Sequence, residues 1–184
     1  MAVKIKEVID TLTADAEPVT PTVDKLETGR PETIVKGIAI TFLATHEIIE
    51  KAKNLGVNLL ISHEGIFFSH HDRREILKGD PVFEEKRRLL EECGMAVFRF
   101  HDSIHRYQPD AITQGLVESL GWTGCEVESL PDASILEIPE TTMKEIVSTV
   151  KNRLCLPYVR FTGDPATPCR RVGYLRDTAA RAIP

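Results

Sequence analysis

Apolar strands alternate with amphipathic helices along most of this chain, and this alternation constrains its fold more than any other feature. Strands are predicted at 34–43, 57–62 and 95–101, with side chains that are apolar almost throughout. Helices at 45–56 and within 79–94 separate them. Continuous apolar strands joined by helices are typical of βαβ units whose parallel sheet is buried on both faces. The sequence therefore predicts an α/β fold with a mostly parallel sheet flanked by helices.

The other helices, strands and connections are predicted from the spacing of apolar residues and from residues that typically begin or end a helix or strand. Residues 14–33 are rich in proline, threonine and acid, and predict an extended or looping connection. A capping box from Thr142 to Glu145 predicts the start of a helix. The other predicted elements are helices over 1–13, 109–121 and 141–154 and strands over 134–140, 158–163 and 170–177. We expect a single α/β domain over residues 1–184.

Charge and hydropathy argue against several classes of function. The 184 residues carry a formal charge of −5, so there is no basic excess to follow a phosphate backbone, and nucleic-acid binding driven by net charge is disfavoured. No apolar stretch approaches the roughly 18 residues that a membrane-spanning helix needs. The N-terminus lacks the apolar core of a signal peptide. The four cysteines are scattered, which is typical of a reducing compartment, so we expect a cytoplasmic protein without a membrane partner.

Two of the predicted strands end in histidine and acid. One strand runs into His63 and Glu64, and another ends with His101 and Asp102 and is followed by His105. In an open parallel sheet the carboxyl ends of the strands share one edge, and ligands bind there. We therefore expect these imidazoles to converge on a single cation.

The donor set indicates which metals fit. Three imidazoles with the Glu64 carboxylate suit iron, zinc or manganese better than magnesium or calcium, and a carboxylate that bridges two ions also allows a dinuclear site. Asp102 is assigned as a residue that orients a histidine or acts as a catalytic base. A histidine at one strand end is commonly only a hydrogen-bonding residue, so a metal-free α/β scaffold with polar loops stays an alternative.

Three short segments resemble the Nif-three-like family (NGG-one-interacting factor three), over about residues 33 to 125. They are ISHEGIFF, HDSIH and GLVESLGW. In that family the first motif typically has two adjacent histidines and a proline, and the second runs from a histidine to an aspartate four residues later. Here Glu64 stands at the second histidine, Gly65 at the proline and His105 at the aspartate. The two ligand exchanges keep three imidazoles and one carboxylate.

The resemblance implies properties that the residues alone do not show. Members of the family form toroidal homo-hexamers with dinuclear metal sites facing an internal cavity, and often carry the label of type-two GTP cyclohydrolase I. They are longer and add a histidine and a glutamate from a C-terminal motif, whereas no histidine follows His105 here. We therefore expect one or two ions per chain, and the chain could be the N-terminal part of a longer family fold. Glu118, Glu126 and Glu128 are expected to be solvated acids rather than replacement ligands.

These expectations lead to two functional hypotheses. The first is a metal-dependent hydrolase that uses a metal-activated water on a small, nucleotide-like molecule, with His63, Glu64, His101 and His105 as metal ligands. The second is a protein without catalysis that stores metal, delivers it as a metallochaperone or serves as a regulatory assembly protein. The side chains of His70 and His71 are expected to lie in a solvated loop, and Phe67 and Phe68 to pack in the core or an interface.

Overall fold

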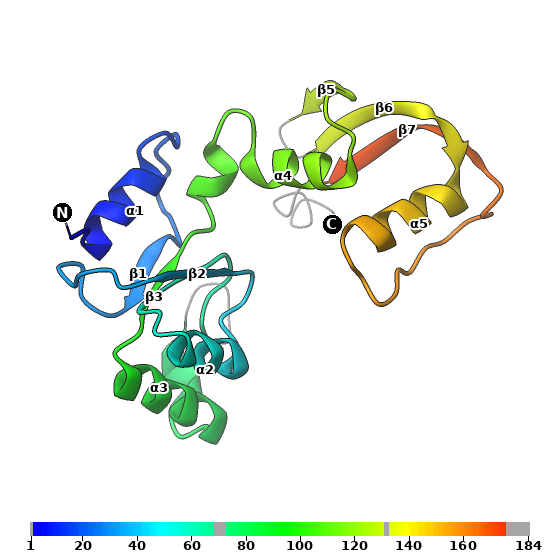
Figure 1. Cartoon of the computed structure of the whole chain (residues 1–184). Coiled ribbons are helices and arrows are strands. Elements are labelled where there is room, and N and C mark those ends of the chain that lie inside the picture. The colour runs from blue at the N-terminus through cyan, green and yellow to red at the C-terminus, as the bar shows by residue number, and fades with distance from the viewer. Residues whose placement is uncertain (1, 68–72, 131–132, 176–184) are drawn as a thin grey trace. The chain divides into compact units, whose positions relative to one another are not determined.

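The computed structural model describes residues 2–67, 73–130 and 133–175, in two compact units (Figure 1). The first unit is Met1–Gln108 and the second is Pro109–Pro184. Each unit combines helices with a β-sheet, which confirms the α/β fold class. The single domain over 1–184 stays a prediction beside this division.

The first unit contains a four-stranded sheet in the order β1-β4-β3-β2. Strands β2 (Ile38–Thr41), β3 (Leu59–Ser62) and β4 (Ala96–Arg99) are parallel, as predicted. Strand β1 (Lys25–Thr28) pairs antiparallel with β4, so the sheet is mixed. The extended or looping connection predicted over 14–33 contains β1, whose four residues KLET have no apolar pattern and form a strand by pairing with β4.

Helices cover both faces of this sheet (Figure 1). Helix α1 (Ile5–Thr13) packs on one face against Leu59 and Phe98. Helices α2 (His46–Asn54) and α3 (Pro81–Cys93) pack on the other face. Two short 3₁₀ turns, η1 (Arg74–Leu77) and η2 (Ser103–Arg106), complete the unit. Nowhere in the described parts of the chain is a helix long and apolar enough to cross a membrane.

Local signals explain where the elements of the first unit begin and end. The Asp80 carboxylate accepts hydrogen bonds from the backbone N–H groups of Val82 and Phe83 at 3.0 and 2.9 Å, which caps α3, and Gly94 ends that helix in the left-handed region with φ of 60°. After β1 the chain turns at Gly29, with φ of 90°. A Cβ there would lie 2.5 Å from the Ala96 Cβ, so only glycine lets β1 lie against β4.

The second unit has its own sheet and core. Strands β5 (Glu126–Leu130), β6 (Ala133–Thr142) and β7 (Pro168–Leu175) form an antiparallel sheet in that order. Helices α4 (Ala111–Leu120) and α5 (Met143–Arg153) contribute to the core with β6 and β7. The Thr142–Glu145 capping box of α5 is confirmed.

Two strand predictions in the second unit differ from the structure. Residues 158–163 form no strand, because Tyr158 and Phe161 are exposed and β7 takes the place beside β6. Strand β5 was not predicted, since all five of its residues are exposed and three are polar. Its structure comes from pairing with β6, which the local sequence does not report.

Candidate metal centre

Parallel pairing brings the ends of β3 and β4 to one edge of the first sheet. Ser62 lies opposite Arg99 in the register, so the residues after each strand emerge side by side. The backbone N–H of His63 donates to the Thr41 carbonyl at 3.1 Å, and that of Glu64 donates to the Phe42 carbonyl at 2.8 Å. These bonds continue the β2–β3 pairing beyond the strands and fix the direction of the loop that carries both side chains.

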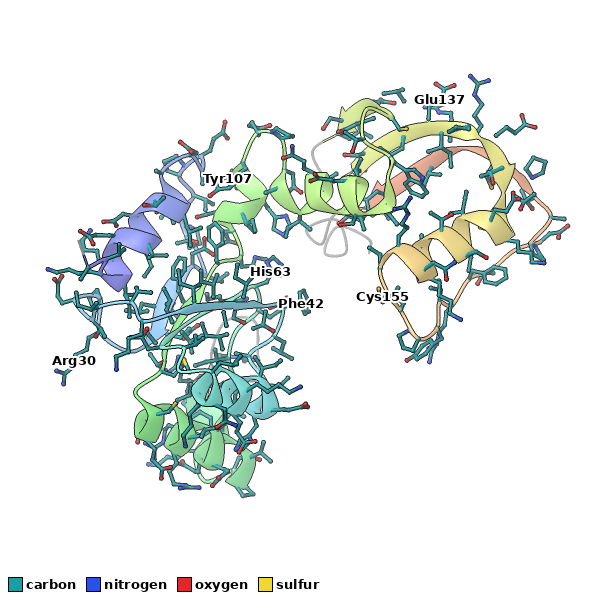
Figure 2. The ribbon with its side chains drawn as sticks, in the orientation of Figure 1. Arg30, Phe42, His63, Tyr107, Glu137 and Cys155 are labelled. Carbon is teal, nitrogen blue, oxygen red and sulfur yellow. The ribbon has the colours of Figure 1, made fainter. Side chains whose placement is uncertain are left out.

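Three of the four residues assigned as metal ligands come together at this edge. One ligand atom from each of His63, Glu64 and His101 lies within 4.8 Å of the others. The His63 and His101 rings are stacked with centroids 4.5 Å apart, and Glu64 Oε1 lies 3.9 Å from His101 Nε2. His101 is only 3% exposed, whereas the other two are half-buried (Figure 2 labels His63). Two imidazoles and a carboxylate within this distance fit a divalent iron, zinc or manganese ion.

The fourth predicted ligand, His105, lies beside the cluster on η2. Its ring stands edge-on to the rings of His63 and His101, with centroid distances of 5.2 and 5.6 Å. Its side chain therefore adjoins the three-residue group without belonging to it. On another side the Phe42 ring stacks on His63 at 5.5 Å, and this aromatic wall was not predicted (Figure 2).

Two aspartates hold the segment after β4, which carries His101. Asp102 Oδ1 lies 3.1 Å from His101 Nδ1, and its Oδ2 accepts hydrogen bonds from the Thr22 hydroxyl and the Val23 backbone N–H, each at 2.9 Å. Asp24 Oδ1 accepts from the backbone N–H groups of His101 and Asp102, both at 2.7 Å, and its Oδ2 accepts from that of Ser103 at 2.8 Å. The loop before β1 thus fixes the backbone that presents His101.

The environment favours the protonation states that a metal site needs. Burial lowers the pKa of His63, and the neighbouring His101 and His105 lower it further, so the ring is held neutral, which is the form that binds metal. Burial alone would raise the pKa of Asp102. The Val23 N–H, the Thr22 hydroxyl and His101 outweigh it and lower that pKa, which keeps the carboxylate ionised.

Arg99 and Asp24 are residues of this site that the sequence analysis missed. Arg99 is the last residue of β4, is 1% exposed, and places its Nη2 3.3 Å from Glu64 Oε2. A charge inside an otherwise apolar strand was the available signal, because buried charges are rare unless they are paired. Asp24 had no local signal, since its hydrogen-bond partners lie 77 to 79 residues away.

Lys86 of α3 supports the loop that follows Glu64. Its Nζ donates to the Ile66 carbonyl and lies 5.7 Å from the centroid of the Phe67 ring. Phe67 packs against Phe83 with centroids 4.6 Å apart, in agreement with the predicted packing role. Phe68, His70 and His71, for which packing and solvated-loop roles were predicted, lie outside the described residues.

The titration of Lys86 predicts a pH dependence of stability. Burial lowers its pKa from 10.5 to about 8, so between these values the unfolded chain binds more protons than the folded chain. The free energy of unfolding contributed by this group therefore rises with pH across that window. In urea denaturation, we expect the wild type to gain stability relative to Lys86→Met between pH about 8 and about 10. A difference between the two proteins that stays constant with pH would contradict this assignment.

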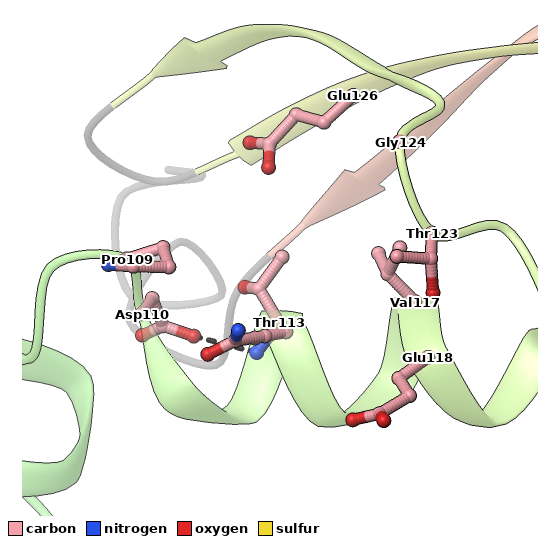
Figure 3. A pocket seen from close by; sticks show the side chains of 9 residues that line it. Pro109, Asp110, Thr113, Val117, Glu118, Thr123, Gly124 and Glu126 are labelled. Carbon is pink, nitrogen blue, oxygen red and sulfur yellow. Dashed lines mark hydrogen bonds between the residues drawn. The ribbon is translucent and has the colours of Figure 1, made fainter.

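The acids weighed as replacement ligands lie in the second unit, and all three are exposed. Glu118 and Glu126 line a pocket of about 270 Å³ beside α4. Asp110, which also lines it, caps the helix by accepting from the Thr113 backbone N–H (Figure 3). Glu128 lies 3.8 Å from the Arg171 guanidinium. Their exposure agrees with the prediction of solvated acids.

This chain is similar to known proteins both in sequence and in fold. The sequence profile of the Duf34/NIF3 family (NGG1p interacting factor 3) matches residues 4–183. A Bacillus cereus protein related to NIF3 superposes with a TM-score of 0.78 at 11% identity, over 95% of this chain and 76% of that one. Staphylococcus aureus protein SA1388 superposes with a TM-score of 0.71 at 16% identity, over 95% and 72%. Reduced HcgD from Methanocaldococcus jannaschii gives 0.63 at 16%, over 83% and 60%. At these identities the likeness concerns the fold alone, and no curated protein matches the sequence.

Proposed function

Because this chain belongs to the Duf34/NIF3 family, we propose that it is a metal-binding protein that acts as a metal-dependent hydrolase on a small, nucleotide-like molecule. The convergence of His63, Glu64 and His101 at one sheet edge carries the proposal. These residues, with His105 beside them, would hold divalent iron, zinc or manganese. The label of GTP cyclohydrolase comes from family resemblance and is not part of the proposal.

The proposed role of each residue follows from its contacts. A divalent ion held by these residues would supply Lewis acidity and would make a water molecule a nucleophile at neutral pH. In the tautomer with its proton on Nδ1, His101 donates to Asp102 and presents the Nε2 lone pair on the side of Glu64. The lowered pKa of Asp102 and its engaged oxygens support an orienting role more than that of a base.

The first unit also offers space for a small molecule. A pocket of about 590 Å³ lies between α1 and residues 16–26, and Thr22, Asp24 and Ser103 are among its lining residues. Thr22 and Asp24 are the side chains that hold Asp102 and the backbone of His101. This volume is in the range of small-molecule sites, which supports a small substrate.

A metal-dependence assay tests the proposed hydrolase. A panel of nucleotides, phosphate esters and carboxylate esters is incubated with the protein before and after reconstitution with Mn²⁺ or Zn²⁺. Turnover that requires added metal and disappears in His63→Ala is the expected result. Tight metal binding without turnover across the panel would contradict catalysis and favour a storage, metallochaperone or regulatory assembly role.

We also propose that the protein is a cytoplasmic homo-oligomer, a hexamer if it assembles like its family. Scattered cysteines support the location. Assembly is supported by β2, which among the described residues pairs only with β3 and so forms a sheet edge. The exposed fractions of Ile40 and Phe42 are 80% and 66%, and no charged residue occurs from Gly37 to Ala44. An apolar, uncharged edge strand is suited to pairing with another chain.

A charge placed on β2 is expected to break the assembly. Ile40→Lys introduces an ammonium group that would be desolvated in an interface, so the molar mass measured by light scattering should fall below that of the wild type. Ile76→Lys is the matched control, because Ile76 is 54% exposed on η1, which contacts β1 at the opposite edge of the sheet through Arg74 and Glu27. A wild type that is already monomeric, or an Ile40→Lys variant of unchanged mass, would overturn the proposed interface.

A further inference from the structure

Arg99 places a buried positive charge directly beside the candidate metal ligands. It follows Val97 by two residues in β4, so both side chains point to the sheet face that α2 and α3 cover. The arginine side chain is only 1% exposed. A guanidinium stays ionised in proteins, and burying it is costly unless anionic or polar groups surround it. A buried cation in this position must affect how metal ions bind to the neighbouring ligands.

The two carboxylate oxygens of Glu64 have different neighbours. Oε2 lies 3.3 Å from Arg99 Nη2, whereas Oε1 lies 3.9 Å from His101 Nε2 and faces the cluster. The guanidinium also lies against the backbone at Gly65, where an added Cβ would be 3.6 Å from Nη1. Arg99 thus contacts one side of the Glu64 carboxylate and supports the loop that carries it.

This arrangement bears on how many ions the site accepts. When a carboxylate bridges two ions with one oxygen on each, both oxygens of Glu64 would have to face metal. A second dication at Oε2 would lie next to the buried guanidinium, and like charges repel strongly where water is excluded. An ion at Oε1 would be farther from the guanidinium, with the anionic carboxylate between the two cations, so the repulsion would be weaker.

We infer that Arg99 is a positioning residue that restricts Glu64 to one metal ion, bound through Oε1 alone, and excludes a Glu64-bridged second ion. The inference rests on the proposed metal centre and specifies its nuclearity. In this role Arg99 acts on the metal through Glu64 and does not touch it.

Manganese binding to the full chain tests the inference. The wild type, titrated with Mn²⁺ and followed by electron paramagnetic resonance, should bind one ion per chain and give the signal of an isolated Mn²⁺. Two ions per chain with an exchange-coupled signal would overturn the inference while leaving the metal centre in place. If the chain binds no Mn²⁺, and a separate titration shows that it binds no Zn²⁺ either, the proposed metal centre and the inference are both overturned.

Two variants separate the charge of Arg99 from its bulk. Arg99→Gln removes the cation, frees Oε2 and should raise the stoichiometry from one Mn²⁺ to two, whereas Arg99→Lys keeps the cation and should stay at one. A folded Arg99→Gln protein that still binds one ion with an unchanged signal would show that Arg99 does not set the stoichiometry. Should that variant fail to fold, the titration is repeated with Arg99→Met, which removes the cation and keeps an apolar side chain inside the sheet; two ions are again expected, and one ion would overturn the role of Arg99.

Discussion

Replacing His63 with alanine is expected to lower the affinity for divalent metal by more than about 100-fold. Even residues that only orient a metal ligand change affinity by about 10- to 100-fold, so losing a ligand itself should cost more. His63 is central to the cluster, since its ring contacts both His101 and His105. The affinities of wild type and variant for Zn²⁺ are compared by competition with a chromophoric chelator.

A second histidine provides the matched control for this prediction. His46 begins α2, is 42% exposed and lies outside the ligand cluster, near Glu50 and Glu85. His46→Ala should bind Zn²⁺ as the wild type does, and circular dichroism should show that both variants are folded. Equal affinities of His63→Ala and the wild type would mean that any bound metal lies elsewhere.

Removing the Asp24 carboxylate is expected to lower the free energy of unfolding by about 3 kcal/mol. Its two oxygens accept three backbone hydrogen bonds from His101, Asp102 and Ser103. Each charge-assisted bond contributes about 1.5 to 3 kcal/mol, and the sum is reduced here because Asp24 is only partly buried. Asp24→Ala should also lower metal affinity by about 10-fold or more, since the His101 backbone loses its support.

The free energy of unfolding of Asp24→Ala is measured by urea denaturation, and a variant of a surface aspartate is the control. Asp10→Ala removes a carboxylate of α1 that pairs with Lys6 in solvent, and should change the free energy of unfolding by no more than about 0.5 kcal/mol. Asp24→Asn should lie between Asp24→Ala and the wild type, because an amide offers one oxygen instead of two. Equal stabilities of Asp24→Ala and Asp10→Ala would contradict the role assigned to Asp24.

The parts of the site that follow from local pattern could be predicted from the sequence. Apolar strands with helical connections place β3 and β4 side by side and parallel, so the residues after them, His63 and His101, must share one edge. The helix ends at Asp80 and Gly94 follow from equally local signals. Where the functional residues lie within a few positions of a strand or helix end, a single sequence is sufficient to predict them.

The supports of the site depend on contacts between distant segments, which no local pattern reports. Asp24 reaches the His101 backbone across 77 residues, and β1 becomes a strand only by pairing with β4. Strand β5 likewise depends on β6. Arg99 stood out as a charge in an apolar strand, but its contact with one oxygen of Glu64 required the three-dimensional structure. The nuclearity of the site, on which that contact bears, could not be inferred from the residue types alone.

The metal content of the untagged wild-type chain is the most direct test of the central claim. The protein is reconstituted with iron, zinc or manganese, desalted and analysed by plasma mass spectrometry together with the double variant His63→Ala, His101→Ala. We expect one retained ion per wild-type chain and none in the double variant. A wild type that retains no ion after reconstitution, or a double variant that retains as much as the wild type, would contradict a metal centre formed by His63, Glu64 and His101.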